Sequence, residues 1–292
     1  MNSTTRDRWA EWLAERRFGG SAALREEMLD RLAQVRDQVL DGAGLGEDET
    51  LLDVGCGEGL IGFGALERGA RTVIFSDISS DLLDFCRQAA MDFDVLDRCR
   101  FVKASAEDLA SIEDDAVDVV ATRSVLIYVK DKGAAFREFA RILRPGGRIS
   151  LSEPINRFGS EERWHERLAG YRLDGLDEIG AKLFAVFDSL QPCDADPMLD
   201  FDERDLLRLA EEAGFFPLEL RLRAVIESLA PRGWDAFLDT AGNPNIPTLR
   251  EAMDEVLTPD ERERLTAQLR PLVERGLGEW RMAFAHLTGT RR

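Results

Sequence analysis

Three alternate glycines, Gly55, Gly57 and Gly59, follow directly after the largely apolar run Leu51–Val54. Glycine suits a turn with positive φ, and its lack of a side chain lets a ligand approach the backbone closely. The pattern therefore predicts a strand, a tight turn that cradles a nucleotide-like ligand, and then a helix. A dinucleotide fingerprint would place its third glycine at position 60, where this chain has Leu60. The spacing G-x-G-x-G thus disfavours a nicotinamide-dependent oxidoreductase.

An acidic residue, Asp77, ends the next apolar run, Thr72–Ser76. At the tip of a neighbouring parallel strand, its carboxylate would lie beside the glycine turn. A carboxylate in that place suits the two hydroxyls of a ribose. The turn and Asp77 together indicate a ligand that contains a nucleoside.

Strand and helix signals alternate through the first half of the chain, after an amphipathic helix expected over residues 21–41. We expect strands near residues 50–55, 72–77, 100–104, 117–123 and 147–153, and helices near 59–68, 79–91 and 131–143. This alternation predicts a parallel, doubly wound α/β sheet. Ligands of such sheets bind at the carboxyl ends of the strands, where the glycine turn and Asp77 would lie.

Five segments extend the pattern in a fixed order: LLDVGCGEG, VIFSDIS, VKASAEDL, DVVATRSVLIYV and RILRPGGRISLSEP. Through them, over roughly residues 48–155, the chain resembles class I S-adenosylmethionine-dependent methyltransferases, in particular the type 11-like small-molecule group. The resemblance implies a Rossmann-like, seven-stranded, mainly parallel sheet whose last strand lies antiparallel beside the fifth. It also implies S-adenosyl-L-methionine as the cofactor and S-adenosyl-L-homocysteine as the product.

The same resemblance assigns roles around the cofactor. Asp53 and the backbone of the glycine turn would hold the methionine part, Asp77 the ribose hydroxyls, and Ile78 one face of the adenine. The backbone carbonyl of Arg123 would face the ammonium group. The full set of implied cofactor-binding residues is Asp53, Gly55, Cys56, Gly57, Gly59, Asp77, Ile78, Ser105, Ala106, Glu107, Arg123 and Ser124.

Two of these assignments have alternatives. Ser105 stands where the family usually has an acidic residue against the adenine amine, so Ser105 with the Ala106 amide, Glu107 or Asp108 could make that contact. Asp53 could also cap the helix that follows the turn, and the two roles can coexist.

Beyond residue 154 the pattern becomes helical and then returns to a strand at 215–225 and a last strand near 279–288. Capping boxes are expected at 202–205, 248–251 and 258–261. We therefore expect an N-terminal helical segment (1–47), a cofactor-binding core (48–157), a first helical cap (158–200), a continuation of the core (201–230), a second helical insertion (231–278) and the last strand (279–292).

Four side chains near the expected acceptor pocket are candidates for catalysis: Tyr128, His165, Glu153 and Tyr171. In related enzymes the position of Tyr128 often faces the transferred methyl group. His165 could take a proton from the nucleophile, or it could be an exposed histidine on a charged helix. Glu153 could bind or deprotonate an acceptor, or make a structural hydrogen bond at the tip of the fifth strand. Tyr171 lies in the first cap.

Two further features bear on the ligands. An N-terminal run, Arg16–Gly20, could fold over the cofactor and place an arginine on its carboxylate. Apolar side chains of the first cap could form a dry pocket for an aromatic or isoprenoid acceptor, or could serve packing alone. They are Phe158, Trp164, Leu183, Phe184, Phe187 and Leu190.

Composition excludes several partners. The chain of 292 residues has a net charge of −18, which would repel a phosphate backbone, so we expect no nucleic-acid partner. No stretch reaches the roughly 18 to 20 apolar residues of a membrane span, and the charged start Met1–Arg17 lacks the apolar centre of a signal peptide. We therefore expect a cytoplasmic protein without a membrane partner. The four cysteines lack the spacing of a metal site, so no metal is expected.

The leading hypothesis is a methyltransferase that acts on a small-molecule acceptor by in-line displacement, with the two insertions enclosing the acceptor. A protein that binds S-adenosylmethionine without transferring its methyl group, as a regulatory subunit or scaffold, is one alternative. A peptide or protein acceptor is another. Either insertion could also mediate a homodimer.

Overall fold

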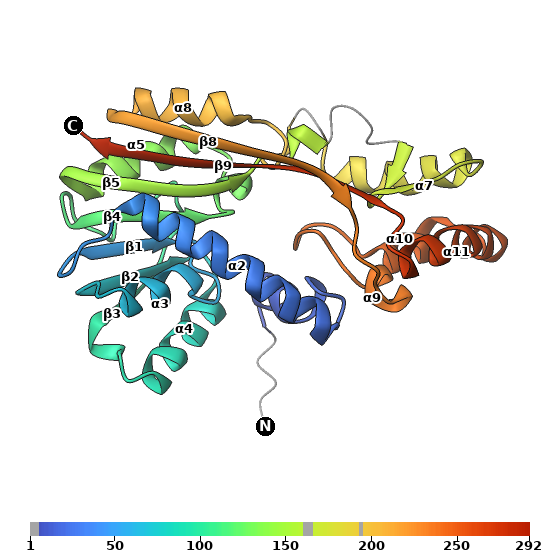
Figure 1. Cartoon of the computed structure of the whole chain (residues 1–292), viewed down its shortest axis with the longest axis horizontal. Coiled ribbons are helices and arrows are strands. Elements are labelled where there is room, and N and C mark those ends of the chain that lie inside the picture. The colour runs from blue at the N-terminus through green and yellow to red at the C-terminus, as the bar shows by residue number, and fades with distance from the viewer. Residues whose placement is uncertain (1–5, 160–165, 193–194) are drawn as a thin grey trace.

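A seven-stranded sheet forms the centre of the protein (Figure 1). The structure is a computed structural model that describes residues 6–159, 166–192 and 195–292. The sheet consists of β1 (Thr50–Val54), β2 (Thr72–Asp77), β3 (Cys99–Lys103), β4 (Val117–Arg123), β5 (Leu143–Pro154), β8 (Phe215–Ser228) and β9 (Glu279–Arg291). The strand order is β3-β2-β1-β4-β5-β9-β8, and β9 runs antiparallel to both of its neighbours. The predicted doubly wound, mainly parallel α/β fold is confirmed, including the antiparallel last strand beside the fifth.

Both faces of the sheet are covered, which explains why its strands read as apolar runs. The helices over the sheet are α2 (Ala22–Ala43), α3 (Leu60–Glu67), α4 (Ser80–Asp92), α5 (Lys132–Ile142) and α8 (Glu203–Glu212). Leu40 of α2 and Ala65 of α3 share one core cluster with Phe75 of β2. Phe136 of α5 and Leu206 of α8 belong to a second cluster. β1, β2 and β4 are therefore packed from two sides, whereas the edge strand β3 is partly exposed.

In the first half of the chain, the strand and helix bounds fall close to the predicted ones, with one exception. β5 begins at Leu143, ahead of the predicted start near residue 147. Leu143 pairs with Val117, and after an irregularity Arg148 pairs with Val119. The strand therefore extends backwards through a turn sequence, Pro145–Gly147, that local signals assign to a loop.

The predicted capping boxes are present at the starts of α8, α10 (Leu249–Val256) and α11 (Pro259–Glu274). In each, the first side chain accepts a hydrogen bond from the backbone three residues on, and the acidic residue there reaches back to the first amide. The pairs are Asp202 with Asp205, Thr248 with Glu251, and Thr258 with Glu261. None of the helices in the described ranges is long and apolar enough to cross a membrane.

The two insertions pack together as one helical unit at the end of the molecule opposite the sheet (Figure 1). It contains α7 (Asp177–Leu190), α9 (Trp234–Leu238), α10, α11 and the hairpin formed by β6 (Arg167–Leu168) and β7 (Tyr171–Arg172). Leu183 of α7 shares a buried cluster with Met253 of α10 and Leu265 of α11. The first insertion, predicted as helical, is thus partly a β-hairpin, and it packs against the second. β8 and β9 run as a long ribbon from the sheet to this unit (Figure 1).

The N-terminal segment lies between the core and the helical unit. It comprises α1 (Arg8–Glu11) and a single π-helical turn, η1 (Trp12–Arg16), which leads toward α2. The Asp7 carboxylate accepts a hydrogen bond from the Ser79 hydroxyl at 2.6 Å, at the start of α4. The Trp12 indole N–H donates to the Ala241 carbonyl at 2.9 Å, just past α9. The segment therefore bridges the two parts of the protein.

Candidate active site

The glycine turn at the end of β1 exposes its backbone to a large cleft. Gly55, Gly57 and Gly59 have φ angles of 61°, 53° and 81°, all in the left-handed region. A Cβ on Gly55 would lie 2.5 Å from a methyl group of Val125, so no side chain fits there. A Cβ on Gly57 would meet only Leu13, at 3.8 Å, and would project into open space. The turn is therefore a cradle that a side chain would partly fill.

Asp77 fixes the turn from the tip of β2. Its carboxylate accepts hydrogen bonds from the backbone amides of Gly57 and Ser79, each at 2.9 Å. Burial raises the pKa of Asp77, and the two amide hydrogen bonds oppose that shift. Asp77 also lines the cleft, so the carboxylate can hold the turn and face a ligand.

Asp53 lies buried beneath the same turn. It accepts a hydrogen bond from the Gly62 amide at 2.9 Å, which is the helix-capping contact considered from the sequence. Burial, with a smaller contribution from the nearby charge of Asp77, raises the pKa of Asp53 to about 7. Near neutral pH this group can therefore gain or lose a proton when a charged ligand arrives.

The cleft has a volume of about 1430 Å³ and collects nearly all of the predicted cofactor residues. Those that line it are Asp53, Gly55, Cys56, Gly57, Asp77, Ile78, Ser105, Ala106, Glu107, Arg123 and Ser124. Gly59 does not line it; this residue precedes α3, and a Cβ there would lie 2.5 Å from the ring of Phe63. One carboxylate oxygen of Glu107 accepts a hydrogen bond of 2.6 Å from the Asp131 amide, at the start of α5. The Ser105 hydroxyl is also engaged, since it donates to Glu107 at 3.4 Å and accepts from the Glu107 amide at 3.3 Å. Ser105, Ala106 and Glu107 line the cleft and Asp108 does not, so the first three stay open as alternatives for an adenine contact.

The structure separates the four catalytic candidates. Tyr128 lines the cleft, on the short 3₁₀ turn η3 (Leu126–Tyr128), with its ring edge-on to Trp9 at 4.8 Å. Burial raises the pKa of Tyr128 to about 12, so its hydroxyl is a donor at neutral pH. Tyr171 does not line the cleft; the β6–β7 hairpin buries it in the helical unit, edge-on to Phe237. His165 lies outside the described residues.

Glu153 is fully buried behind the cleft wall. One carboxylate oxygen accepts hydrogen bonds from the Thr122 hydroxyl at 2.9 Å and from the Val125 amide at 3.1 Å. The other oxygen has no hydrogen-bond partner among the described residues. Burial raises the pKa of Glu153 to about 6. The geometry matches the structural alternative, because the carboxylate holds the turn that leads from β4 to Tyr128.

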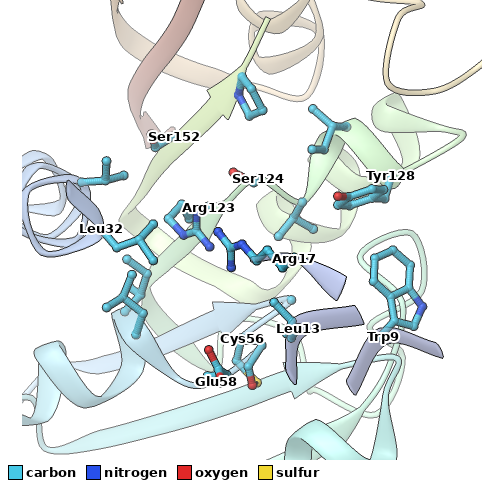
Figure 2. A pocket seen from close by; sticks show the side chains of 18 of the residues that line it. Trp9, Leu13, Arg17, Leu32, Cys56, Glu58, Arg123, Ser124, Tyr128 and Ser152 are labelled. Carbon is cyan, nitrogen blue, oxygen red and sulfur yellow. The ribbon is translucent and has the colours of Figure 1, made fainter. Parts of the chain in front are cut away.

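Two arginines enter the cleft from different parts of the chain. Arg17 follows the π-helical turn, and Arg123 ends β4. Figure 2 shows their side chains extending toward one another in the pocket, with Cys56 and Glu58 below them and Tyr128 to one side. The expectation that an arginine of the run 16–20 reaches the cofactor region is in line with the position of Arg17. The inward direction of the Arg123 side chain was not predicted.

Apolar side chains of α2, β8 and β9 line one part of the cleft, and the first insertion adds Pro197 and Met198. Leu32 and Val35 of α2 line the cleft together with Trp280, Met282 and Phe284 of β9. Leu183 and Phe184, which were candidates for a dry acceptor pocket, pack inside the helical unit. The sequence does indicate the β9 part of this lining: Trp280, Met282 and Phe284 are large apolar residues spaced two apart, which places them on one face of a strand.

Known proteins with similar sequences are methyltransferases. Residues 52–151 match the family described as "Methyltransferase domain". The tRNA 5-carboxymethoxyuridine methyltransferase of Escherichia coli (strain K12) is 37% identical over 100 residues, which are 34% of this chain and 38% of that enzyme. Methyltransferase GfsG of Streptomyces halstedii is 26% identical over 211 residues, 70% of this chain and 68% of its own.

Among solved structures, a geranyl diphosphate methyltransferase in complex with S-adenosylmethionine has a TM-score of 0.56 and 18% identity. The alignment covers 94% of each chain. At that identity the similarity establishes the shared fold. The family match falls on the strands and turns that surround the cradle, so the sequence resemblance and the three-dimensional site coincide.

Proposed function

We propose that the chain, whose residues 52–151 match the methyltransferase domain family, is a class I S-adenosylmethionine-dependent methyltransferase that transfers a methyl group from this cofactor to a small-molecule acceptor. The strongest support is the open cradle at Gly57 with Asp77 beside it. S-adenosylmethionine is the cofactor of this family, and when bound it supplies a methyl group already activated by the sulfonium. The protein then has to position two reactants in line, which is catalysis by proximity and orientation.

The described residues fit the cofactor. The backbone at Gly57 is open to close approach, and the two oxygens of Asp77 retain acceptor capacity beyond the two amides for a ribose diol. Ile78 is 46% exposed at the cleft edge, where it can cover an adenine face. Leu13 and Trp9 of the N-terminal segment also line the cleft and can exclude water from the bound cofactor.

The cleft has room for an acceptor beside the cofactor. Pockets for one small molecule usually span about 300 to 1000 Å³, and this one measures about 1430 Å³. That room weakens the alternative of a scaffold with a blocked acceptor site. Its apolar wall of Leu32, Val35, Met282 and Phe284 suits an acceptor with an aromatic or isoprenoid body. The N-terminal segment and the loop around Ala241 narrow the site, which favours a small acceptor over a folded protein.

Within the site we assign two roles on the acceptor side. Tyr128 would orient the acceptor through its hydroxyl, which stays protonated at neutral pH because burial raises its pKa to about 12. Glu153 would act as a positioning residue, because it holds the β4–η3 turn and does not reach the cleft. We assign no role to Tyr171.

The test is to incubate the protein with methyl-labelled S-adenosylmethionine and three separate fractions: a small-molecule extract of its host, tRNA, and protein. We expect the label in one extractable small molecule. Label in tRNA or protein would refute the acceptor class. Cofactor binding by calorimetry with no label in any fraction would favour the scaffold alternative and refute transfer.

A further inference from the structure

Two positive charges lie together in the cleft. The half-buried guanidinium groups of Arg17 and Arg123 both line it and extend toward one another (Figure 2). Burial and, to a smaller extent, the charge of Arg17 together lower the pKa of Arg123 to about 10, which places the two groups within electrostatic reach. Arg17 packs over the rings of Trp12 and Phe18, at 5.5 and 5.2 Å from their centres. Its position is therefore fixed by packing.

Neither guanidinium has a carboxylate partner among the described residues, although the chain is strongly acidic. The neighbouring Arg16 pairs with Glu251 at 2.5 Å, and Arg148 of β5 pairs with Glu49 at the same distance. Removing a charge from water without a counter-charge is unfavourable, so buried charges are usually paired. Two adjacent unpaired cations in a cleft indicate that a ligand supplies the missing negative charge.

The acidic side chains around the pair are engaged elsewhere. Glu58 pairs with Arg25 at 3.7 Å. Asp77 holds the amides of the glycine turn, and Glu153 holds the β4–η3 turn from behind the wall. Asp53 faces the Gly62 amide. Glu58 attracts Arg17, and Glu153 and Asp53 attract Arg123, but only from beyond ion-pair distance. Both guanidinium groups therefore remain available to a ligand in the cleft.

We propose that the acceptor carries an oxyanion, a carboxylate or a phosphate, that binds between Arg17 and Arg123. This inference rests on the proposed function, since it concerns the second substrate of that reaction. Planar guanidinium groups bind carboxylate and phosphate oxygens in pairs of parallel hydrogen bonds. The cofactor's own carboxylate could use only part of this site, because a carboxylate offers about four acceptor positions while two guanidinium groups present about ten N–H donors.

The neighbouring surfaces define the rest of the acceptor. Tyr128 lies beside the pair and contributes to the electrostatics of both arginines, so its hydroxyl can donate to the same oxyanion. The wall of Leu32, Val35 and Phe284 lines the same cleft. The acceptor class is therefore an amphipathic small molecule, with an anionic group at the arginine pair and an apolar body along α2 and β9.

The experiment titrates oxyanions into the protein saturated with S-adenosylhomocysteine, so that the cofactor's carboxylate is already in place. Inorganic pyrophosphate and benzoate are the probes, at constant ionic strength, followed by calorimetry. We expect one or both to bind. Tighter binding of pyrophosphate would indicate a phosphate on the acceptor, and tighter binding of benzoate would indicate a carboxylate. Arg17→Gln and Arg123→Gln should each weaken this binding about tenfold or more, because one fork of charge-assisted hydrogen bonds is lost. Arg270→Gln, which removes an exposed arginine paired with Glu274 on α11, should leave it unchanged.

The alternative is that the pair serves the cofactor alone. In that case the S-adenosylhomocysteine complex binds neither probe, both glutamine variants lose affinity for S-adenosylhomocysteine, and binding of methylthioadenosine, which lacks the amino-acid part, is unaffected. That result would overturn the proposal. Failure of the proposed function has a different signature: either the wild-type protein does not bind S-adenosylhomocysteine, or it binds the cofactor and oxyanions while no label moves from methyl-labelled S-adenosylmethionine to any fraction. Arg17→Gln keeps the test valid if Arg123→Gln does not fold, since Arg17 lies outside the sheet.

Discussion

The substitution Asp77→Asn tests the centre of the cofactor site with almost no change in shape. The carboxylate accepts from the amides of Gly57 and Ser79, and we propose that its remaining acceptor capacity takes the ribose hydroxyls. An asparagine keeps one oxygen but presents an NH2 group in place of the other. It therefore loses one charge-assisted hydrogen bond to the protein and one to the cofactor.

A hydrogen bond to a charged group contributes about 1.5 to 3 kcal/mol. Since about 1.4 kcal/mol corresponds to tenfold in affinity, we expect the dissociation constant of S-adenosylhomocysteine to rise about 10- to 150-fold. Stability of the unliganded protein should fall by an amount near the lower end of the same range, because burial raises the pKa of Asp77 and its charge is already unfavourable in the folded state. Calorimetry measures the first effect and urea unfolding the second.

Asp84→Asn is the matched control, because Asp84 lies exposed on the same helix, α4, that follows Asp77. It should leave both quantities unchanged. A dissociation constant for Asp77→Asn within twofold of the wild type would refute the ribose contact, whatever the effect on stability.

Three further predictions concern neighbouring groups. Gly57→Ala should lower the free energy of unfolding by about 1 kcal/mol, because alanine is strained at positive φ. It should also weaken S-adenosylhomocysteine binding, measured by calorimetry, because its methyl group enters the cradle. The control is Gly146→Ala, at φ 80° in open space away from the cleft, which should lower stability in the same way without the loss of binding. The unfolding free energy should fall as pH rises from about 4 to about 7, by up to about 1.4 kcal/mol per pH unit, because folded Asp53, with its pKa raised to about 7, holds a proton that the unfolded chain has released. Asp53→Asn should reduce that slope in urea unfolding across this pH range, and an unchanged slope would contradict the raised pKa. Tyr128→Phe should lower the turnover of the identified acceptor while S-adenosylhomocysteine affinity stays constant, and an unaltered rate would remove Tyr128 from the site.

Much of the fold and of the cofactor site could be predicted because the signals are local. The spacing of Gly55 and Gly57 follows from the turn itself, which needs positive φ and a bare backbone. Asp77 is placed by the rule that parallel strands end at one edge of the sheet. The capping boxes depend on residues three apart in the chain. Each of these constraints acts over a few residues, so one sequence is sufficient to read it.

The acceptor side could not be predicted in the same way. Apolar side chains such as Phe184 carry the same periodicity whether they line a pocket or pack in a core, and here the second insertion covers them. Glu153 lies at a strand tip, where functional residues often occur, yet its carboxylate accepts a hydrogen bond from the backbone of the β4–η3 turn and does not reach the cleft. A local pattern does not specify which distant surface arrives to bury a side chain.

The sequence by itself determined the parallel sheet, the cradle and the carboxylate beside it, because the periodicity of apolar residues and the conformational demands of glycine act within each element. Only the tertiary structure decided what closes the site. Trp12 meets Ala241 across 229 positions of sequence, and this contact belongs to the packing that brings the segment of Arg17 to the strand end that carries Arg123. Such contacts depend on how whole elements pack against one another. That packing brings Arg17 and Arg123, which are far apart in the sequence, into the same cleft.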